Sequence, residues 1–428
     1  MADNTNKKLR NMLIYQIFVR NYSPKGDFAG VENDLDRIKE LGVDIVYLLP
    51  IHPIGLKNRK GSLGSPYAIS DYRSINPEYG TLEDFISLVD AIHKKDMKCI
   101  IDVVYNHTSP DSELSKEHPE WFYHKDDGSF GNRVGEWSDV IDLDYGNREL
   151  WDYQIDTLKY WAAIVDGFRC DVAPMVPITF WEKARSEVEN VRPGCIWLAE
   201  TIDPGFLLQL RAQGIPAHSD AEIYRAFDIS YDYDIYADMV GYLTGKKELC
   251  DYAEVVNRQE YVYPDNYVKM RFLENHDRSR AAFMIPNEQA LRNFTAFSFF
   301  QKGIAFIYAG QEYGAEHLPS LFDKDTVDMC PRDSADMSGM ICRLSRIKKR
   351  EIFTESSYKV NVPAENIMVA THSGKGVNLT GIFSLKGKTA HVPVMIPDGI
   401  YNDILSDEKI EIYEGALNIY GKPLIIEW

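Results

Sequence analysis

Two charged residues stand two positions apart where the apolar segment 165–171 ends. Side chains of an extended strand alternate between its faces, so Arg169 and Asp171 share one face. Two charges inside a strand are costly unless they pair or take part in chemistry. We expect the arginine to keep the Asp171 carboxylate ionised at neutral pH, which makes Asp171 a candidate nucleophile. A buried structural ion pair is the alternative interpretation of this segment alone.

A second carboxyl group, that of Glu200, ends the next apolar segment, 196–200. The preceding Trp-Leu-Ala run predicts a raised pKa and a protonated acid. A protonated acid beside an ionised carboxylate is the pair that glycoside hydrolysis uses, and retaining enzymes hold the two groups about 5 Å apart. Neighbouring strands lie about 4.8 Å apart, so adjacent strands would supply this spacing. Capping of the following helix is the alternative role for Glu200.

Further polar residues follow other apolar segments. His107 lies two residues after the segment 98–105, and His276 and Asp277 come after the segment 267–273. If these segments are parallel strands of one barrel, their carboxyl ends meet at one mouth, where barrel enzymes carry their chemistry. Three carboxylates, two histidines and Arg169 are then expected to converge.

Predicted strands and helices alternate along the part of the sequence that positions these residues. Strands are expected at 14–19, 43–49, 98–105, 165–171, 196–200, 224–229, 267–273 and 304–308, and helices at 30–41, 82–94, 148–163, 178–190, 287–301 and 338–349. The nearly continuous apolar character of several strands is typical of parallel strands buried on both faces. The pattern predicts an α/β fold, a (β/α)8 TIM barrel, rather than a doubly wound sheet.

Two segments depart from this alternation. Residues 108–147 are rich in His, Pro, Trp and Tyr and are too long for an ordinary loop, which predicts a short inserted subdomain after the third strand. From about residue 358 the chain changes to short strands with glycine turns, expected at 367–371, 381–385, 389–394, 410–412 and 423–428. We therefore predict a catalytic barrel at 1–354 and a small C-terminal antiparallel β domain at 355–428.

The composition restricts the classes of partner that the protein is expected to bind. The formal charge of −18 disfavours nucleic acids and anionic membranes. The six cysteines lack metal-ligand spacing and are expected to be reduced core thiols. The apolar run near the amino terminus is too short and interrupted for a membrane span, and no signal peptide is evident, so we expect a cytoplasmic protein. The sequence makes no prediction of the oligomeric state.

Four ordered segments carry a family resemblance. Asp102-Val-Val-Tyr-Asn-His107, Gly167-Phe-Arg-Cys-Asp171, Ala199-Glu200 and Phe272-Leu-Glu-Asn-His-Asp277 resemble, in this order, the four signature regions of the α-amylase family of glycoside hydrolases. Further matches are Gly64-Ser-Pro-Tyr67 with Asp71-Tyr72, Ile75-Asn-Pro-Glu-Tyr-Gly80, Val140-Ile-Asp-Leu-Asp144 and Ile307-Tyr-Ala-Gly-Gln-Glu312. The resemblance extends from residue 12 to about residue 350.

The resemblance implies a role for each matched residue. Asp171 matches the nucleophile, Glu200 the acid/base and Asp277 the third carboxylate, which binds sugar hydroxyls and helps to stabilise the transition state. The substrate-binding positions are matched by residues that orient the nucleophile, hydrogen-bond the sugar or stack on it: Arg169, His107, His276 and Tyr67. Asp102 matches a position that supports the arginine, which is a structural role.

The sequence departs from the family at two places. Many α-amylases carry Lys-His three and four residues after the nucleophile, serving the leaving-group side and a structural calcium ion, whereas this chain has Pro174 and Met175. The inserted segment is also short, and Asn106 is the one matched calcium position, too few ligands for a hard cation. We expect no cofactor in the chemistry and a metal-independent fold, with structural calcium as the alternative.

The resemblance implies a retaining hydrolase that acts on α-1,4-linked glucans such as maltodextrins, starch or glycogen. A 4-α-glucanotransferase or an α-glucosidase on the same scaffold is the nearest alternative, because loop and subsite shapes separate these activities. A non-catalytic sugar-binding or chaperone module is the alternative of another class. Such relatives usually lose one or more carboxylates, and this chain has all three.

Overall fold

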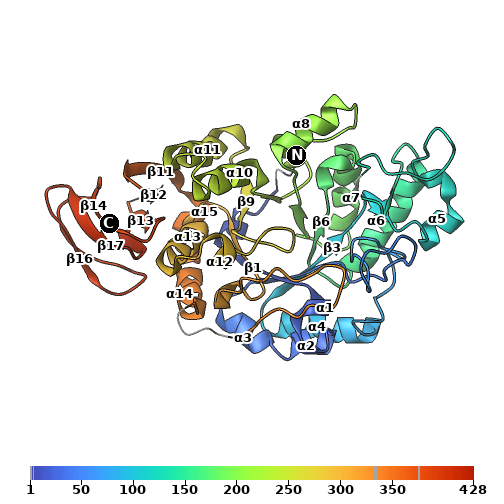
Figure 1. The fold of residues 1–428 in the computed structure, drawn as a ribbon, viewed down its shortest axis with the longest axis horizontal. Helices are drawn as coiled ribbons and strands as arrows, with labels where there is room; N and C mark the ends of the chain where they lie inside the picture. Colours follow the sequence, from blue (N-terminus) through green and yellow to red (C-terminus); the bar gives the residue numbers. More distant parts are fainter. Residues whose placement is uncertain (1, 3, 136, 331–334, 375) are drawn as a thin grey trace.

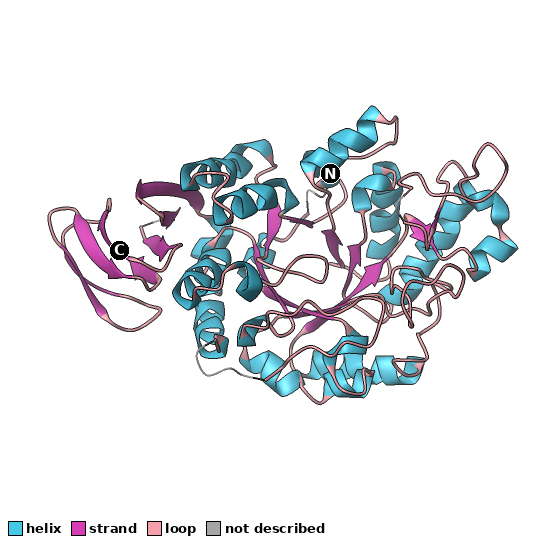
Figure 2. Ribbon diagram, viewed as in Figure 1, coloured by secondary structure: helices cyan, strands magenta, loops and turns pink. Residues whose placement is uncertain are grey.

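A closed eight-stranded parallel barrel forms the centre of the molecule (Figures 1 and 2). The structure is a computed structural model that describes residues 2, 4–135, 137–330, 335–374 and 376–428. The strands follow one another around the barrel in the order β1-β10-β9-β8-β7-β6-β3-β2. Their bounds are β1 Leu13–Ile17, β2 Ile45–Leu48, β3 Lys98–Val103, β6 Gly167–Cys170, β7 Ile196–Ala199, β8 Ile229–Tyr231, β9 Val268–Arg271 and β10 Ile304–Tyr308. The prediction of a TIM barrel is confirmed.

Helices surround the barrel and cover the outer face of its strands (Figure 2). The longer ones are α4 Leu82–Lys94, α6 Arg148–Ala162, α7 Ile178–Glu189, α8 Pro204–Ala212, α10 Tyr233–Leu243, α11 Leu249–Val262, α13 Glu288–Phe300 and α14 Ser338–Lys348. Short helices are α1 Val19–Tyr22, α2 Phe28–Glu32, α3 Leu35–Glu40, α9 Asp220–Ile223, α12 Ala281–Met284 and α15 Ile352–Glu355. The capping box between Thr81 and Asp84 explains why α4 begins where the sequence predicts.

Close approach between β6 and β7 requires glycine at one point. A Cβ atom built on Gly167 would lie 2.4 Å from the carbonyl oxygen of Ile196 on β7. The absence of a side chain lets the two strands pair in the register Arg169↔Leu198 and Cys170↔Ala199. This register brings the residues that follow both strands, Asp171 and Glu200, to the same edge of the barrel.

The prediction of the sixth strand at 224–229 is wrong. Residues 220–223 form α9, which begins with a capping box between Ser219 and Glu222, and helical turns continue to Phe227. The strand β8 starts at Ile229 instead. The single helix expected at 30–41 is also wrong, because Asn33 and Asp34 separate α2 from α3.

The segment after β3 departs from the barrel as expected. It contains the short pair β4 His107–Thr108 and β5 Ile141–Asp142, the helix α5 Glu113–Glu117 and a turn of 3-10 helix at Pro119–Trp121. The pairing places His107 directly opposite Asp142. The segment therefore returns to the barrel mouth beside the end of β3.

The chain ends in an antiparallel β domain, drawn in red at the left of Figure 1. Its main sheet has the order β11-β12-β13-β18, and the pairs β14-β17 and β15-β16 lie beyond it. Along β12, Met368 and Ala370 belong to the barrel's core, whereas Ile367 and Val369 belong to a separate core with the outer pairs. The bounds are β11 Ser357–Ala364, β12 Ile367–Ser373, β13 Asn378–Ser384, β14 Thr389–Pro393, β15 Gly399–Asn402, β16 Lys409–Ile412, β17 Ala416–Tyr420 and β18 Leu424–Glu427.

Candidate active site

A cavity of about 220 Å3 opens at the carboxyl ends of the barrel strands. Asp171 follows β6, Glu200 follows β7 and Asp277 follows β9, and all three line this cavity. Tyr67 and His107 line it from the loop after β2 and from β4. The structure thus brings together in one place the carboxylates that the sequence placed at separate strand ends.

The Arg169 side chain is fully buried and contacts three carboxylates. Its Nη1 atom donates to both oxygens of Asp102, at 2.7 and 2.9 Å, and to Asp171 Oδ1 at 2.9 Å. Its Nη2 atom lies 2.7 Å from Glu200 Oε1. That contact lacks the alignment of a hydrogen bond, since Nη2 has no hydrogen-bond partner. Arg169 therefore hydrogen-bonds Asp102 and Asp171 and forms an ion pair with Glu200.

Burial is the largest influence on the pKa values of both carboxyl groups of the pair. Burial and the nearby charge of Glu200 raise the pKa of Asp171 well above its usual range, although Arg169 opposes this. Burial also raises the pKa of Glu200. The raised pKa of Asp171 runs against the expectation that Arg169 keeps this carboxylate ionised, whereas the raised pKa of Glu200 agrees with the acid expected there. Both shifts favour retention of a proton within the pair.

The residue after Asp171 has a strained backbone. Val172 is β-branched, yet it lies in the left-handed region with φ 34° and ψ 43°. This conformation turns its backbone N–H toward Glu200 Oε2, to which it donates at 2.9 Å. The strain thus coincides with a contact to one oxygen of Glu200, whereas Arg169 contacts the other.

Tyr67 lines the other side of the cavity, and the fully buried ring of His276 packs against it. His276 Nε2 lies 2.6 Å from the Tyr67 hydroxyl and 3.1 Å from Asp277 Oδ2, and the two rings stack at 5.5 Å. Asp277 keeps 42% of its side chain exposed. Burial within the walls opposes its charge, but His276 and Arg169 outweigh this and lower the pKa of Asp277 to about 2. This carboxylate therefore faces the open part of the cleft as an anion.

His107 is buried beside the candidate nucleophile. Its Nε2 atom lies 4.0 Å from Asp171 Oδ2, and its Nδ1 atom lies 3.1 Å from the amide nitrogen of Asn106. Burial lowers the pKa of His107 to about 4. A neutral imidazole next to Asp171 can hydrogen-bond a neutral sugar hydroxyl without adding a charge to the cluster.

Several residues of the site were missed by sequence reasoning. Tyr231 on β8 accepts a hydrogen bond from Arg169 Nε at 3.2 Å, and Gln16 on β1 lies 3.0 Å from His276 Nδ1. Lys60 and Asp139 form an ion pair of 2.8 Å at the cavity wall, and the Trp137 ring lies 5.5 Å from that of His107. The aromatic content of 108–147 was a signal for Trp137. Tyr231 was missed because its strand was misplaced.

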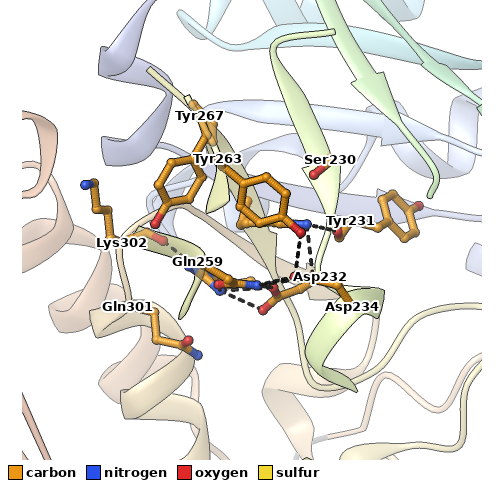
Figure 3. A network of polar contacts seen from close by, with 12 residues as sticks. Ser230, Tyr231, Asp232, Asp234, Gln259, Tyr263, Tyr267, Gln301 and Lys302 are labelled. Atoms are coloured by element: carbon orange, nitrogen blue, oxygen red, sulfur yellow. Dashed lines mark hydrogen bonds and ion pairs between the residues drawn. The ribbon is translucent and has the colours of Figure 1, made fainter. Parts of the chain in front are cut away.

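A buried polar network surrounds the carboxyl end of β8 (Figure 3). Gln259 on α11 donates to Asp232 and Asp234, and Tyr263 donates to Asp234. Lys269 Nζ on β9 pairs with Asp234 at 2.9 Å and donates to the carbonyl oxygen of Tyr231 at 3.1 Å. The network thus holds the backbone of Tyr231, whose hydroxyl accepts a hydrogen bond from Arg169 in the candidate site.

Asn106 occupies the matched calcium position. The amide nitrogen of Asn106 is directed to His107. Within the part of the chain that the structure describes, no three His, Cys, Asp or Glu side chains gather as a metal ion would require. Among the described helices, none is both long and apolar enough to cross a bilayer.

Two models of known protein families match successive parts of the chain. A family model described as "Alpha amylase, catalytic domain" matches residues 2–129 and 117–361, and one described as "Bacterial Alpha amylase C-terminal domain" matches residues 359–426. The protein named alpha-amylase MalA from Haloarcula japonica is 29% identical over 315 residues, which cover 71% of this chain. The chain spans 44% of that relative's length.

Solved structures of similar proteins cover nearly the whole chain. The crystal structure of an α-amylase from Lactobacillus plantarum superposes with a TM-score of 0.96 at 50% identity, covering 99% of this chain and 100% of the other. A noncanonic maltogenic α-amylase, AmyB, from Thermotoga neapolitana superposes with a TM-score of 0.88 at 32% identity, covering 98% and 99%. Both similarities extend through the barrel and the C-terminal domain.

Proposed function

Because the chain belongs to the α-amylase family, we propose that it is a retaining glycoside hydrolase that cleaves α-1,4-glucosidic bonds in maltodextrins, starch or glycogen-type glucans. One observation carries this proposal: Asp171, Glu200 and Asp277 line one cavity at the carboxyl ends of the strands. Arg169 lies between the first two and contacts both. A pair of carboxyl groups that share a proton is what double displacement at a sugar carbon requires.

In the first step, Glu200 donates its proton to the glycosidic oxygen while the bond from C1 to that oxygen breaks. Asp171 attacks C1 from the opposite face and forms a glycosyl ester. Arg169 holds Asp171 Oδ1, so Oδ2, which lies on the side of His107, is the oxygen that attacks. Water then gives its proton to Glu200, its oxygen attacks C1, and the carboxylate of Asp171 leaves.

The surrounding side chains bind the sugar. Asp277 and His107 line the cavity and can hydrogen-bond hydroxyl groups, the ring of Tyr67 offers a surface for stacking, and the buried His276 acts through its contacts with Tyr67 and Asp277. The anionic Asp277 stabilises the positive charge that develops on the sugar ring in the transition state. Arg169 acts on the reaction by orienting the carboxylates.

Replacing the nucleophile tests the proposal. Asp171→Ala is expected to lower the rate of maltoheptaose cleavage by at least about 10⁴-fold, because the covalent step is lost. Arg169 keeps two carboxylate partners in this variant, so the fold should remain intact by circular dichroism. Asp152→Ala, at an exposed ion pair on α6, is the matched control and should retain full activity. Undiminished cleavage by Asp171→Ala would overturn the assignment.

A 4-α-glucanotransferase or an α-glucosidase would use the same carboxylates. The product profile from maltoheptaose separates the three activities. We expect a mixture of shorter maltooligosaccharides. Products longer than the substrate would indicate transfer, and glucose as the single early product would indicate an exo-acting glucosidase.

We also propose a cytoplasmic location, and the six free thiols support a reducing compartment. The division into residues 1–354 and 355–428, with an insertion at about 108–147, is supported by the start of β11 at Ser357 and by the family match at 359–426. The substrate is an α-glucan, and neither a nucleic acid nor a membrane is proposed as a partner.

A further inference from the structure

A second pocket lies beside the catalytic cavity, between the loop after β2 and the insertion after β3. Its volume is about 560 Å3, which falls within the range of small-molecule sites. We call it the basic pocket and define it by six of the polar side chains that line it: Lys57, Asn58, His124, Lys125, Asn132 and Ser138. None of these six residues lines the catalytic cavity.

The lining of the basic pocket is rich in positive charge, although the whole chain has a formal charge of −18. Two lysines and one histidine line it, and no aspartate or glutamate is found among the described residues of the lining. Neither Lys57 nor Lys125 forms an ion pair with another described residue. A local excess of positive charge on an acidic protein attracts anions to this place.

The carboxylates that are hydrogen-bonded to the lysine-bearing segments have other partners. Asp111 accepts a hydrogen bond from the backbone N–H of Lys57 at 3.1 Å. Asp127 accepts from the backbone N–H and the hydroxyl of Ser129, at 2.9 and 2.6 Å. These hydrogen bonds, aided by the charge of Lys125, lower the pKa of Asp127. Both lysine amines can therefore serve a ligand.

Local contacts hold two of the basic side chains against the walls of the pocket. His124 Nδ1 lies 2.9 Å from the carbonyl oxygen of Phe122, and the His124 ring lies 5.0 Å from that of Phe130. The imidazole is thus held through Nδ1, and Nε2 is left for a ligand. The stem of Lys125 lies close to Gly131, where a Cβ atom would come within 2.8 Å of the lysine Cε. Side chains held in this way lose less freedom when a ligand binds.

The basic pocket and the catalytic cavity share a wall formed by three consecutive residues of the insertion. Ser138 lines the pocket, Asp139 lines the cavity and Val140 lines both. The loop after β2 joins this wall on each side: Asn58 donates to the carbonyl oxygen of Ser138 at 3.2 Å, and Lys60 pairs with Asp139 at 2.8 Å. A ligand that contacts Ser138 therefore touches the wall of the catalytic cavity.

We propose that the basic pocket binds the phosphate ester of a sugar. A phosphate group gains from both lysine charges, whereas a neutral glucan gains little from them. The ring of Phe130, which also lines the pocket, offers an apolar face to the sugar. The ester can come from two sources, a free sugar phosphate or a phosphorylated glucosyl unit of a glucan. Its binding does not depend on the proposed hydrolase activity.

Isothermal titration calorimetry at low ionic strength tests the binding. Glucose 6-phosphate is the probe, and glucose and inorganic phosphate report the separate contributions of the sugar and of the charge. We expect glucose 6-phosphate to bind with a dissociation constant below about 1 mM and at least about tenfold more tightly than either of the other two. Added salt should weaken this binding, because it screens exposed charges.

Two double variants locate the site. Replacing both Lys57 and Lys125 by glutamine should weaken the binding of glucose 6-phosphate at least about tenfold, because hydrogen bonds to a charged group are lost. Both side chains are exposed, so the fold should remain intact by circular dichroism. Replacing Lys94 and Lys388 by glutamine is the matched control, because it removes the same charge from two exposed positions outside the pocket. This control should bind the probe as the wild type does.

A pair of substrates distinguishes the two sources of the ester. Maltoheptaose that carries a 6-phosphate on one glucosyl unit is compared with maltoheptaose by kcat/KM. A preference of at least about tenfold for the phosphorylated chain, lost in the pocket variant, would identify a phosphorylated glucan as the ligand. Equal values, together with binding of glucose 6-phosphate, would identify a free sugar phosphate.

The remaining outcomes would overturn the inference or the proposed function separately. Glucose 6-phosphate that binds no more tightly than glucose, or equally tightly to both double variants, would show that the basic pocket is not a phosphate site. Inorganic phosphate that binds as tightly as glucose 6-phosphate would overturn the assignment to a sugar ester. Cleavage of maltoheptaose in either case leaves the proposed function standing. Binding of glucose 6-phosphate without cleavage of any glucan would refute the proposed function and leave the pocket assigned.

Discussion

Replacing Val172 by alanine and by glycine would measure the strain beside Glu200. In an unstrained helix or strand, glycine is less stable than alanine by about 0.4–1 kcal/mol, mainly because glycine has more freedom in the unfolded chain. At φ 34° and ψ 43° the order should reverse, because the left-handed conformation costs a residue with a Cβ atom about 1–2 kcal/mol. Both variants lose the methyl groups of the valine, so their difference isolates the backbone.

The two contributions set the expected size of the reversal. A conformational cost of about 1.5 kcal/mol, less an entropic difference of about 0.7 kcal/mol, leaves Val172→Gly more stable than Val172→Ala by about 0.8 kcal/mol. The same pair of substitutions at Leu208, an exposed position inside α8, should favour alanine by about 1 kcal/mol. The two sites should thus differ by nearly 2 kcal/mol, with opposite signs.

Guanidinium denaturation of the four variants, followed by circular dichroism, supplies the measurement. The pairwise difference in the free energy of unfolding is compared between the two positions at equal slope of the transition. If Val172→Ala equals or exceeds Val172→Gly in stability, the backbone is not strained there, and the account of how Val172 is held against Glu200 is wrong. Activity should be similar in both variants, since each retains the N–H that contacts Glu200.

Three further experiments probe the site. Tyr231→Phe removes the acceptor of Arg169 Nε and should lower kcat about tenfold with little change in KM, because the arginine acts through the carboxylates; a change confined to KM would contradict this role. Burial lowers the pKa of His107 from 6.5 to about 4, so the unfolded chain binds a proton that the folded chain does not, and stability should fall by about 2 kcal/mol between pH 7 and pH 4.5. Denaturation of His107→Asn at both pH values should show a smaller fall, and an equal fall would reject the assignment. Treatment with a chelator should leave the melting temperature unchanged, and a large decrease would establish a structural metal ion.

The parts of the fold that sequence predicted correctly are those with local signals. The helix α4 begins and ends at Leu82 and Lys94 as expected, because a capping box starts it and its apolar period is regular. The strand β10 agrees at both ends as well. The strand β8 was misplaced because only three residues pair there, too few for a pattern. The helices α10 and α11, which follow β8 in the chain, were not predicted from the sequence.

In the candidate site, too, the features predicted correctly are those with a signal in the local sequence. Strand ends predicted which carboxylates would converge, since parallel strands must share their carboxyl edge. Strand ends did not predict that Arg169 contacts Glu200 and Tyr231, because Glu200 follows β7 and Tyr231 lies on β8. The family resemblance did predict its contact with Asp102. The left-handed backbone of Val172 was equally hidden, since a valine gives no local signal for positive φ.

The charge balance around Arg169 explains why the local interpretation failed. One guanidinium contacts Asp102, Asp171 and Glu200, so a single positive charge faces three carboxyl groups in a buried place. Ionising all three would leave excess negative charge away from water, which is costly. Retaining one proton on the pair of Asp171 and Glu200 relieves that cost. Burial therefore favours a proton on this pair, which the proposed mechanism assigns to Glu200, and Asp102 contributes by engaging both its oxygens with the arginine's Nη1.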